Sequence, residues 1–199
     1  MATMVRTASR GVQAWRQVGI AGSQAGLSLL DTLVVVSVAG VMLAIAIPSV
    51  GTALTDARAN AAMRAVEGHL RASRDEAMSV RRAVEVQFVD GGQLQSTQLE
   101  GTNRRVILTT ALENNMRFQV TPGLPDTPDL FGQAAGIDFG GPTTVYFQPE
   151  GSLTDAAGLP VSGTVFLGAP DRLLSARAVT VLGPTGRVRG YRWDGIAWR

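Results

Sequence analysis

Residues 26–55 read GLSLLDTLVVVSVAGVMLAIAIPSVGTALT, and this stretch decides how the chain is organised. From Thr32 to Thr55 there are 24 residues without a charge. A helix of about 20 apolar residues is long enough to cross a bilayer. Three arginines and no acid precede the stretch. Because basic residues gather on the cytoplasmic side of a membrane, we predict a single span with the N-terminus in the cytoplasm and the rest of the chain outside.

The same helix is predicted to continue beyond the apolar run, over residues 56–82. Apolar side chains recur there at steps of three, four and seven residues, which is typical of one apolar helix face. These side chains are Met63, Val66, Leu70, Ala77 and Val80. Pro48 is the one strong helix breaker in the combined segment, and the loss of its backbone donor predicts a bend there.

After Arg82 the apolar period changes to two, which indicates β-strands. We predict an α+β fold, in which a long N-terminal transmembrane and amphipathic helix precedes a small antiparallel β-sheet domain at residues 83–199. Gly and Pro predict a long loop at residues 121–142. The strands are expected at residues 84–88, 106–110, 116–120, 144–148, 164–167, 178–182 and 188–193.

The start of the apolar run carries a specific motif. Gly26 directly precedes it, Asp31 follows five residues later, and Pro48 stands further along. The segment resembles the type IV prepilin cleavage motif, with Leu27 where phenylalanine is more usual and Asp31 where glutamate is more usual. The resemblance implies that a prepilin peptidase removes residues 1–26 by cleaving between Gly26 and Leu27, and that Leu27 is then N-methylated.

The resemblance also gives residues 27–55 and 56–82 their roles, as the transmembrane and filament-core helix and its amphipathic continuation. An acid inside an apolar segment is costly without a partner. In the family this partner is the N-terminal amine of a neighbouring subunit, so Asp31 and Pro48 are predicted assembly residues. Gly40 and Ala44 form a small-residue surface that lets membrane helices approach closely.

Two other interpretations of this segment remain open. Ala44-Ile45-Ala46 is similar to a signal-peptidase site, which would make the segment an ordinary signal peptide. A plain anchor that carries a periplasmic β domain explains the hydrophobicity as well. Neither interpretation accounts for the spacing of Gly26, Asp31 and Pro48.

Segments further along the chain narrow the family. They are LRASRDEA at residues 70–77, VYFQPEGS at 145–152, and AVTV followed by PTGRVR at 178–189. They resemble the minor pseudopilin H and FimT family. This implies a minor pseudopilin of a type II secretion system, assembled with other pilin or pseudopilin subunits into a periplasmic pseudopilus at the bacterial inner membrane. The alternative is a minor pilin of a type IV pilus that contacts DNA during uptake.

Charge is unevenly distributed in the predicted β domain. Residues 83–171 contain three arginines and ten acids, whereas residues 172–199 contain six arginines and one acid. Arg187, Arg189 and Arg192 alternate with aromatic residues, and such a pattern can bind phosphates and stack bases. They are therefore candidate nucleic-acid-binding residues. The other interpretation is that these arginines pair with the acidic middle of the chain or contact another subunit.

The residue types give little reason to expect an enzyme, a cofactor or a metal site. Cysteine is absent. The single histidine, His69, is expected on the helix surface or at an interface. Carboxylates in the long loop could bind calcium through oxygen, but their spacing fits no EF-hand and a solvated loop is expected. These are Asp126, Asp129 and Asp138. The helix acids are expected to form surface pairs with helix arginines; they are Asp56, Glu67, Asp75 and Glu76.

Overall fold

The computed structural model describes residues 28–89 and 91–199, with the backbone alone for residues 45–50. Gly26 and Leu27 lie outside the described residues, as does the side chain of Pro48, so cleavage and bending remain predictions. The chain divides into two compact units, Met1–Ala44 and Ile45–Arg199. Each unit is described by itself.

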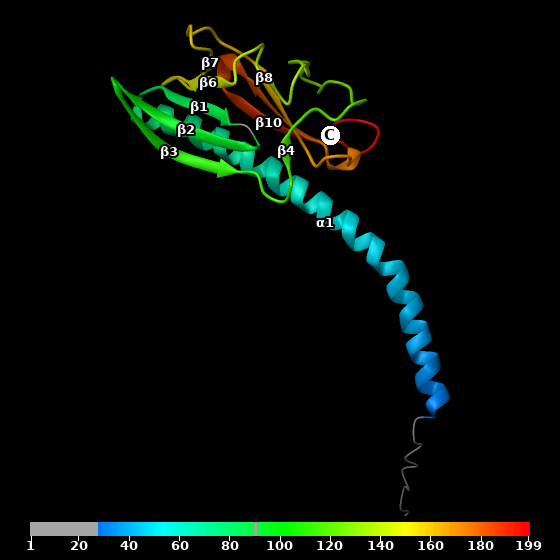
Figure 1. Cartoon of the computed structure of the whole chain (residues 1–199). Helices are drawn as coiled ribbons and strands as arrows, with labels where there is room; N and C mark the ends of the chain where they lie inside the picture. Colours follow the sequence, from blue (N-terminus) through cyan, green and yellow to red (C-terminus); the bar gives the residue numbers. More distant parts are fainter. Residues whose placement is uncertain (1–27, 90) are drawn as a thin grey trace, which may run out of the picture. The chain divides into compact units, whose positions relative to one another are not determined.

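A single α-helix, α1 (Leu29–Val80), contributes to both units (Figure 1). At its start, the backbone N–H of Leu30 donates to Ser28 Oγ at 3.3 Å, which satisfies one of the donors that a helix N-terminus leaves free. At its end, Arg81 has a left-handed φ of 54°, and the N–H of Arg82 returns to the carbonyl of Ala77. The helix thus ends within two residues of its predicted limit.

None of the helices within the described residues is long and apolar enough to cross a membrane. The predicted span also includes Leu27, which lies outside the described residues, and residues 45–50, of which only the backbone is described.

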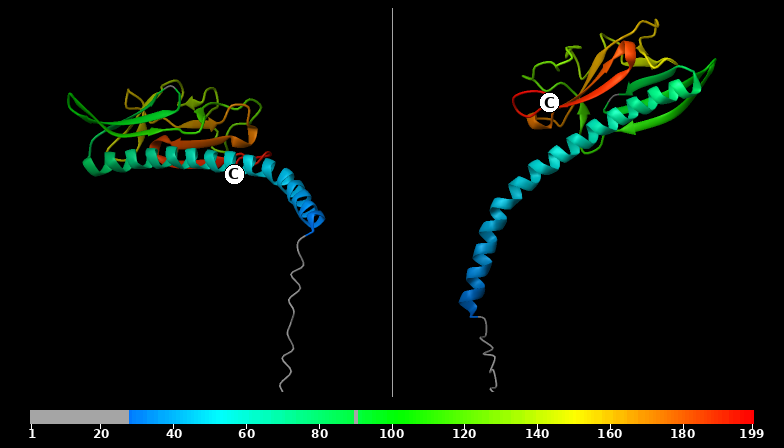
Figure 2. Two further views of the ribbon diagram at one scale, coloured as in Figure 1. Left: turned by 60° about the horizontal axis from the view of Figure 1, so that its bottom comes forward. Right: turned by 180° about the vertical axis from the view of Figure 1, so that it is seen from behind.

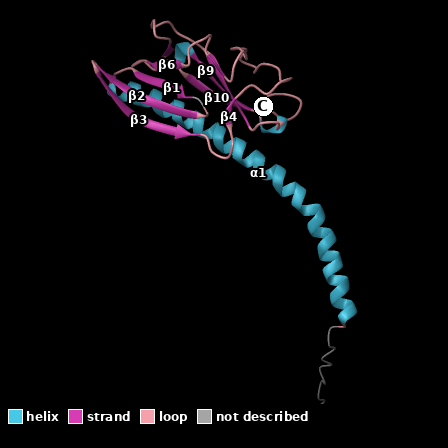
Figure 3. Ribbon diagram, viewed as in Figure 1, coloured by secondary structure: helices cyan, strands magenta, loops and turns pink. Residues whose placement is uncertain are grey.

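Two antiparallel sheets make up the β domain (Figure 3). The first has the strand order β3-β2-β1-β6-β7, and the second has the order β10-β9-β8-β4, with β5 also paired to β8. The first sheet comprises β1 (Val84–Val89), β2 (Gln93–Glu100), β3 (Asn103–Ala111), β6 (Thr144–Phe147) and β7 (Leu153–Thr154). The second comprises β4 (Arg117–Phe118), β5 (Ile137–Asp138), β8 (Gly163–Gly168), β9 (Arg177–Leu182) and β10 (Arg187–Arg192), with short 3-10 helices η1 (Leu173–Ser175) and η2 (Gly183–Thr185).

The α+β fold is confirmed, but three of its strands, β2, β5 and β7, are missing from the strand prediction. β2 was not expected, because its sequence QLQSTQLE is mostly polar. The two-residue strands β5 and β7 are too short to leave a periodic signal. Residues 121–142 form the long loop that Gly and Pro predict, apart from β5.

The C-terminal half of α1 packs on the sheets through one face (Figure 2). Val66, Leu70 and Ala77, all predicted for this face, are fully buried, whereas Met63 is only partly buried. Together with the inward side chains of both sheets, this face forms the main core. A second core cluster lies on the opposite side of the second sheet; it contains Leu124, Phe166, Ala176, Ala178, Trp193 and Trp198. This arrangement fixes which residues of α1 are available for other contacts.

Candidate assembly site

The first turns of α1 expose apolar side chains on every side. Ten large apolar residues between Leu29 and Leu43 are each at least 50% exposed in the single chain. They are Leu29, Leu30, Leu33, Val34, Val35, Val36, Val38, Val41, Met42 and Leu43. Since successive helical residues point in directions about 100° apart, these positions leave no polar face. A helix that is apolar all round is typical of one buried in lipid or among other helices.

Asp31 lies in the first turn of this segment. It takes part in none of the ion pairs found among the described residues. The helix dipole favours an acid at this position by roughly 0.3–1 kcal/mol, which is small beside the cost of a carboxylate in hydrocarbon. Gly40 has no heavy atom within 4 Å of the position its Cβ would take, so this surface is open to a close neighbour. The segment therefore presents an acid and a small-residue surface to whatever packs around it.

The β domain is tied to α1 by a buried arginine. Arg177 on β9 is fully buried, and its guanidinium pairs with Asp56 of the helix. Its Nε donates to Asn60 Oδ1 at 2.9 Å, and Nη1 donates to the carbonyls of Leu174 and Ala176 at 3.0 and 2.8 Å. Burial lowers the pKa of Arg177, and the hydrogen bond and charge of Asp56 oppose that shift. The prediction that Asp56 forms a surface pair with a helix arginine is wrong, because its arginine partners, Arg177 and Arg192, lie on the second sheet.

Two turns of the β domain carry the family resemblance, one containing Gly151 and the other Gly186, and both lie against Arg74 of α1. Arg74 Nε donates to the carbonyl of Gly151 at 3.1 Å. A Cβ at Gly186, whose φ is +59°, would lie 2.1 Å from the carbonyl oxygen of Gly151 and 2.9 Å from Arg74. On β10, a Cβ at Gly190 would lie 1.7 Å from Glu67 Oε1. Gly186 is therefore required for the close approach of these two turns, whereas a side chain at Gly190 would displace the end of Glu67.

The structure divides the three candidate nucleic-acid-binding residues between two faces of β10. Arg187 and Arg189 share the face that points away from α1, and both are exposed. Arg192 lies on the other face and pairs with Asp56 at 3.5 Å. Arg189 pairs with Asp129 at 3.5 Å, whereas Arg187 takes part in none of the ion pairs among the described residues.

The acids of the long loop bind protein donors. Asp126 accepts from the N–H groups of Thr127 and Gly132, and Asp138 accepts from those of Ala134 and Gly140. Asp129 accepts from Thr180, Arg189 and Tyr191, and so attaches the loop to the second sheet. In the part of the chain that the structure describes, no group of three or more His, Cys, Asp or Glu residues could hold a metal ion.

His69 is buried at the contact of α1 with the first sheet, so of its two expected places, the helix surface or an interface, the surface is wrong. Nδ1 lies 2.9 Å from Thr110 Oγ1, and Nε2 lies 2.7 Å from Ser96 Oγ. Ser73 donates its hydroxyl hydrogen to the carbonyl of His69, so the hydroxyl of Ser96 donates to Ser73, 2.6 Å away. This leaves Nε2 of His69 to donate to Ser96 and Nδ1 to accept from Thr110. Burial lowers the pKa of His69 from 6.5 to about 4.

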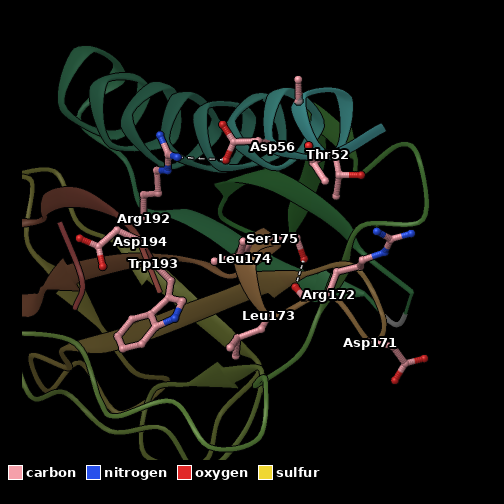
Figure 4. Close-up of a pocket in the computed structure, with 12 residues that line it drawn as sticks. Thr52, Asp56, Asp171, Arg172, Leu173, Leu174, Ser175, Arg192, Trp193 and Asp194 are labelled. Carbon is pink, nitrogen blue, oxygen red and sulfur yellow. Dashed lines mark hydrogen bonds and ion pairs between the residues drawn. The ribbon is translucent and has the colours of Figure 1, made fainter. Parts of the chain in front are cut away.

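A groove of about 520 Å³ lies at the end of the β domain next to residues 52–56 of α1 (Figure 4). Its other walls are residues 171–175, which include η1, and residues 192–194 at the end of β10. Arg192 and Asp56 meet on one side of it, and Leu173 and Trp193 lie on the other. Nothing in the local sequence pattern joins these three segments, and only the tertiary structure reveals the groove.

No protein-family model matches the sequence, and none of the curated proteins matches it. The structure is similar to the type IV minor pilin FimU of Pseudomonas aeruginosa, with 14% identity over 70% of this chain and 91% of that chain and a TM-score of 0.46. A second crystal form of FimU has 14% identity over 66% of this chain and 90% of that chain, with a TM-score of 0.45. The structure is also similar to the minor pseudopilin EpsH from the type 2 secretion system of Vibrio cholerae. The identity is 14% over 68% of this chain and 97% of that chain, and the TM-score is 0.45. These are the two kinds of subunit that the sequence resembles; at such identities and TM-scores, function has to be argued from the residues of this chain.

Proposed function

We propose that the chain is a pilin-like subunit that acts by assembling into a filament, as a minor pseudopilin of a type II secretion system. One observation carries the proposal: residues 29–44 form a helix whose apolar side chains are exposed on every side, with an acid in its first turn. Such a helix requires an apolar environment, which lipid supplies before assembly and neighbouring helices supply in a filament.

The mechanism is mechanical. Prepilin peptidase removes residues 1–26 at the inner membrane, and Leu27 becomes the methylated N-terminus. Asp31 then pairs with the N-terminal amine of a neighbouring subunit, because an unpaired carboxylate is costly in an apolar helix bundle. The contacts of Arg177 with Asp56 and Asn60 transmit force between the helix and the periplasmic β domain.

Processing is tested by the intact mass of protein extracted from membranes. We expect a chain that begins at Leu27 and carries one methyl group. A species of precursor length, or one that begins after Ala46, would contradict the proposal and favour a plain anchor or a signal peptide.

Assembly is tested with Asp31→Asn, which removes the charge and keeps the size of the side chain. We expect normal trimming of the leader and a strong loss of cross-linking to neighbouring subunits. Asp75→Asn is the matched control, since Asp75 lies on the same helix with 74% of its side chain exposed. Cross-linking of Asp31→Asn at the level of this control would refute the role of Asp31.

The alternative is a minor pilin of a type IV pilus that contacts DNA. The observation that favours it is the position of Arg187 and Arg189 on one exposed face of β10, the edge strand of its sheet. Replacing both with alanine should then weaken binding of duplex DNA by the full chain in detergent at low salt, whereas Arg117→Ala on β4 should not. DNA binding that is absent, or unchanged by the double substitution, would refute the contact.

A deletion strain distinguishes a type II secretion system from a type IV pilus as the machine to which the subunit belongs. Loss of protein secretion with intact pili and transformation supports the pseudopilin. Loss of transformation with intact secretion supports the type IV pilus.

A further inference from the structure

The groove beside residues 52–56 is bordered by an exposed apolar patch. Leu173 and Leu174 in η1 are 46% and 62% exposed, and Ile196 in the C-terminal turn is 85% exposed. The turn lies close to η1, since Leu174 Cδ2 is 3.5 Å from the position of a Cβ on Gly195. η1, which precedes β9, and the turn that follows β10 thus place large apolar side chains at the same end of the β domain.

Charged residues of both signs lie around this patch, and Asp171, Arg172 and Asp194 line the groove beside it. Arg172 directly precedes the two leucines, is exposed, and takes part in none of the ion pairs found within the described residues. Trp193 borders the groove but is only 6% exposed and belongs to the second core cluster. Exposed leucines with an arginine at their margin are typical of surfaces that enter the interfacial region of a bilayer.

The position of the patch along the chain points to the same partner. The helix wall of the groove is made by residues 52–56, and the uncharged run of the sequence ends at Thr55. If the uncharged run is anchored in the membrane as proposed above, residues 52–56 lie at the outer surface of the membrane. The patch, which borders the wall, then lies at the depth of the lipid headgroups.

We propose that this end of the β domain docks on the outer leaflet of the inner membrane before assembly. Leu173, Leu174 and Ile196 enter the boundary between headgroups and acyl chains, and Arg172 binds lipid phosphate. The inference rests on the proposed membrane anchor. It gives the subunit a resting state in which the β domain is held on lipid until it is drawn into a filament.

The absence of cysteine makes the test direct, because single cysteines can be introduced without removing others. Full-length Leu174→Cys and Ile196→Cys are labelled with an environment-sensitive fluorophore in vesicles of phosphatidylcholine and phosphatidylglycerol. Leu159→Cys is the matched control, since Leu159 is 65% exposed in a different loop. Val38→Cys reports the anchor itself. We expect a blue shift, and quenching by lipids brominated on their acyl chains, at 174, 196 and 38 but not at 159.

The outcomes distinguish the inference from the proposed function. Quenching at 38, with labels at 174 and 196 that behave like the label at 159, overturns the docking and leaves the anchor intact. No quenching at 38 refutes the anchor, and the docking with it. A blue shift at 174 that depends on protein concentration and is insensitive to brominated lipid identifies a contact between subunits, and also overturns the docking.

The phosphate contact is tested separately with Arg172→Gln in the Leu174→Cys background. We expect this change to reduce the quenching gained when phosphatidylglycerol is added to phosphatidylcholine. Arg117→Gln, which removes an exposed arginine of β4, should leave that gain unchanged. An equal gain in both variants would contradict the contact of Arg172 with phosphate.

Discussion

The two halves of α1 differ in what surrounds them, although both belong to one regular helix. Residues 29–44 expose large apolar side chains at almost every position. Between Ala59 and Ala77, in contrast, the helix buries one face in the core and exposes charged side chains on the other. The first segment has its partners outside the chain, and the second has them in the β domain. The distribution of charge around a helix therefore distinguishes an assembly segment from a segment that anchors a domain.

The largest effect is expected at the ion pair that fastens the second half to the sheets. Asp56→Ala leaves Arg177 buried without its carboxylate, which should lower the free energy of unfolding by about 3–5 kcal/mol. Urea unfolding of the full chain in detergent, followed by tryptophan fluorescence, measures this change. Asp75→Ala removes an exposed partner 4.0 Å from Arg74 and should cost less than about 1 kcal/mol. Equal losses would mean that the buried pair does not hold the helix to the domain.

A leucine in each half tests the comparison directly. Leu70 is fully buried, so Leu70→Ala should lower the free energy of unfolding by about 2–5 kcal/mol. Leu33 is 61% exposed, so Leu33→Ala should change it by less than about 0.5 kcal/mol. The same unfolding experiment measures both. A large loss for Leu33→Ala would show that the first half also packs within the single chain.

The buried histidine predicts an acid dependence for the second half alone. Because the pKa of His69 is about 4 in the folded chain and near 6.5 when unfolded, the unfolded state binds the proton first as the pH falls. Stability is therefore complete above pH 6.5, and roughly 3 kcal/mol should be lost between pH 6.5 and 4. Comparing urea midpoints of the parent chain and His69→Gln over this range measures the effect. If both chains lose stability equally there, another group is responsible.

The smallest effect is expected on the face of the second sheet that points away from α1. Arg189 is 48% exposed and lies 3.5 Å from Asp129, so Arg189→Ala should cost less than about 1 kcal/mol of unfolding free energy. Tyr191→Phe, which removes a 3.0 Å hydrogen bond to Asp129, should cost about 1 kcal/mol. If Arg189→Ala instead unfolds the loop, seen as increased proteolysis at residues 121–142, it cannot serve as a clean probe of DNA binding.

Strand β2 shows why part of the fold could not be predicted. A strand is recognised in sequence by alternating apolar residues, but Ser96 of β2 is polar and fully buried. It faces His69 and Ser73, which satisfy its hydroxyl. Its polarity makes sense only once the helix lies beside it, and for the same reason the sequence did not predict that His69 is buried against this strand.

The sequence by itself determined the long helix, the exposed apolar character of its first half, the apolar face of its second half, and an antiparallel β domain after Arg82. These are local properties, set by charge and by the period of apolar residues along the chain. The tertiary structure alone decided that Asp56 pairs with Arg177, 121 residues away. It also decided that Arg192 and Arg187 lie on opposite faces of β10, and that η1 and the C-terminal turn form one patch. Each of these depends on strand pairing and on the packing of segments that are distant in the chain, and no local pattern of residues encodes such contacts.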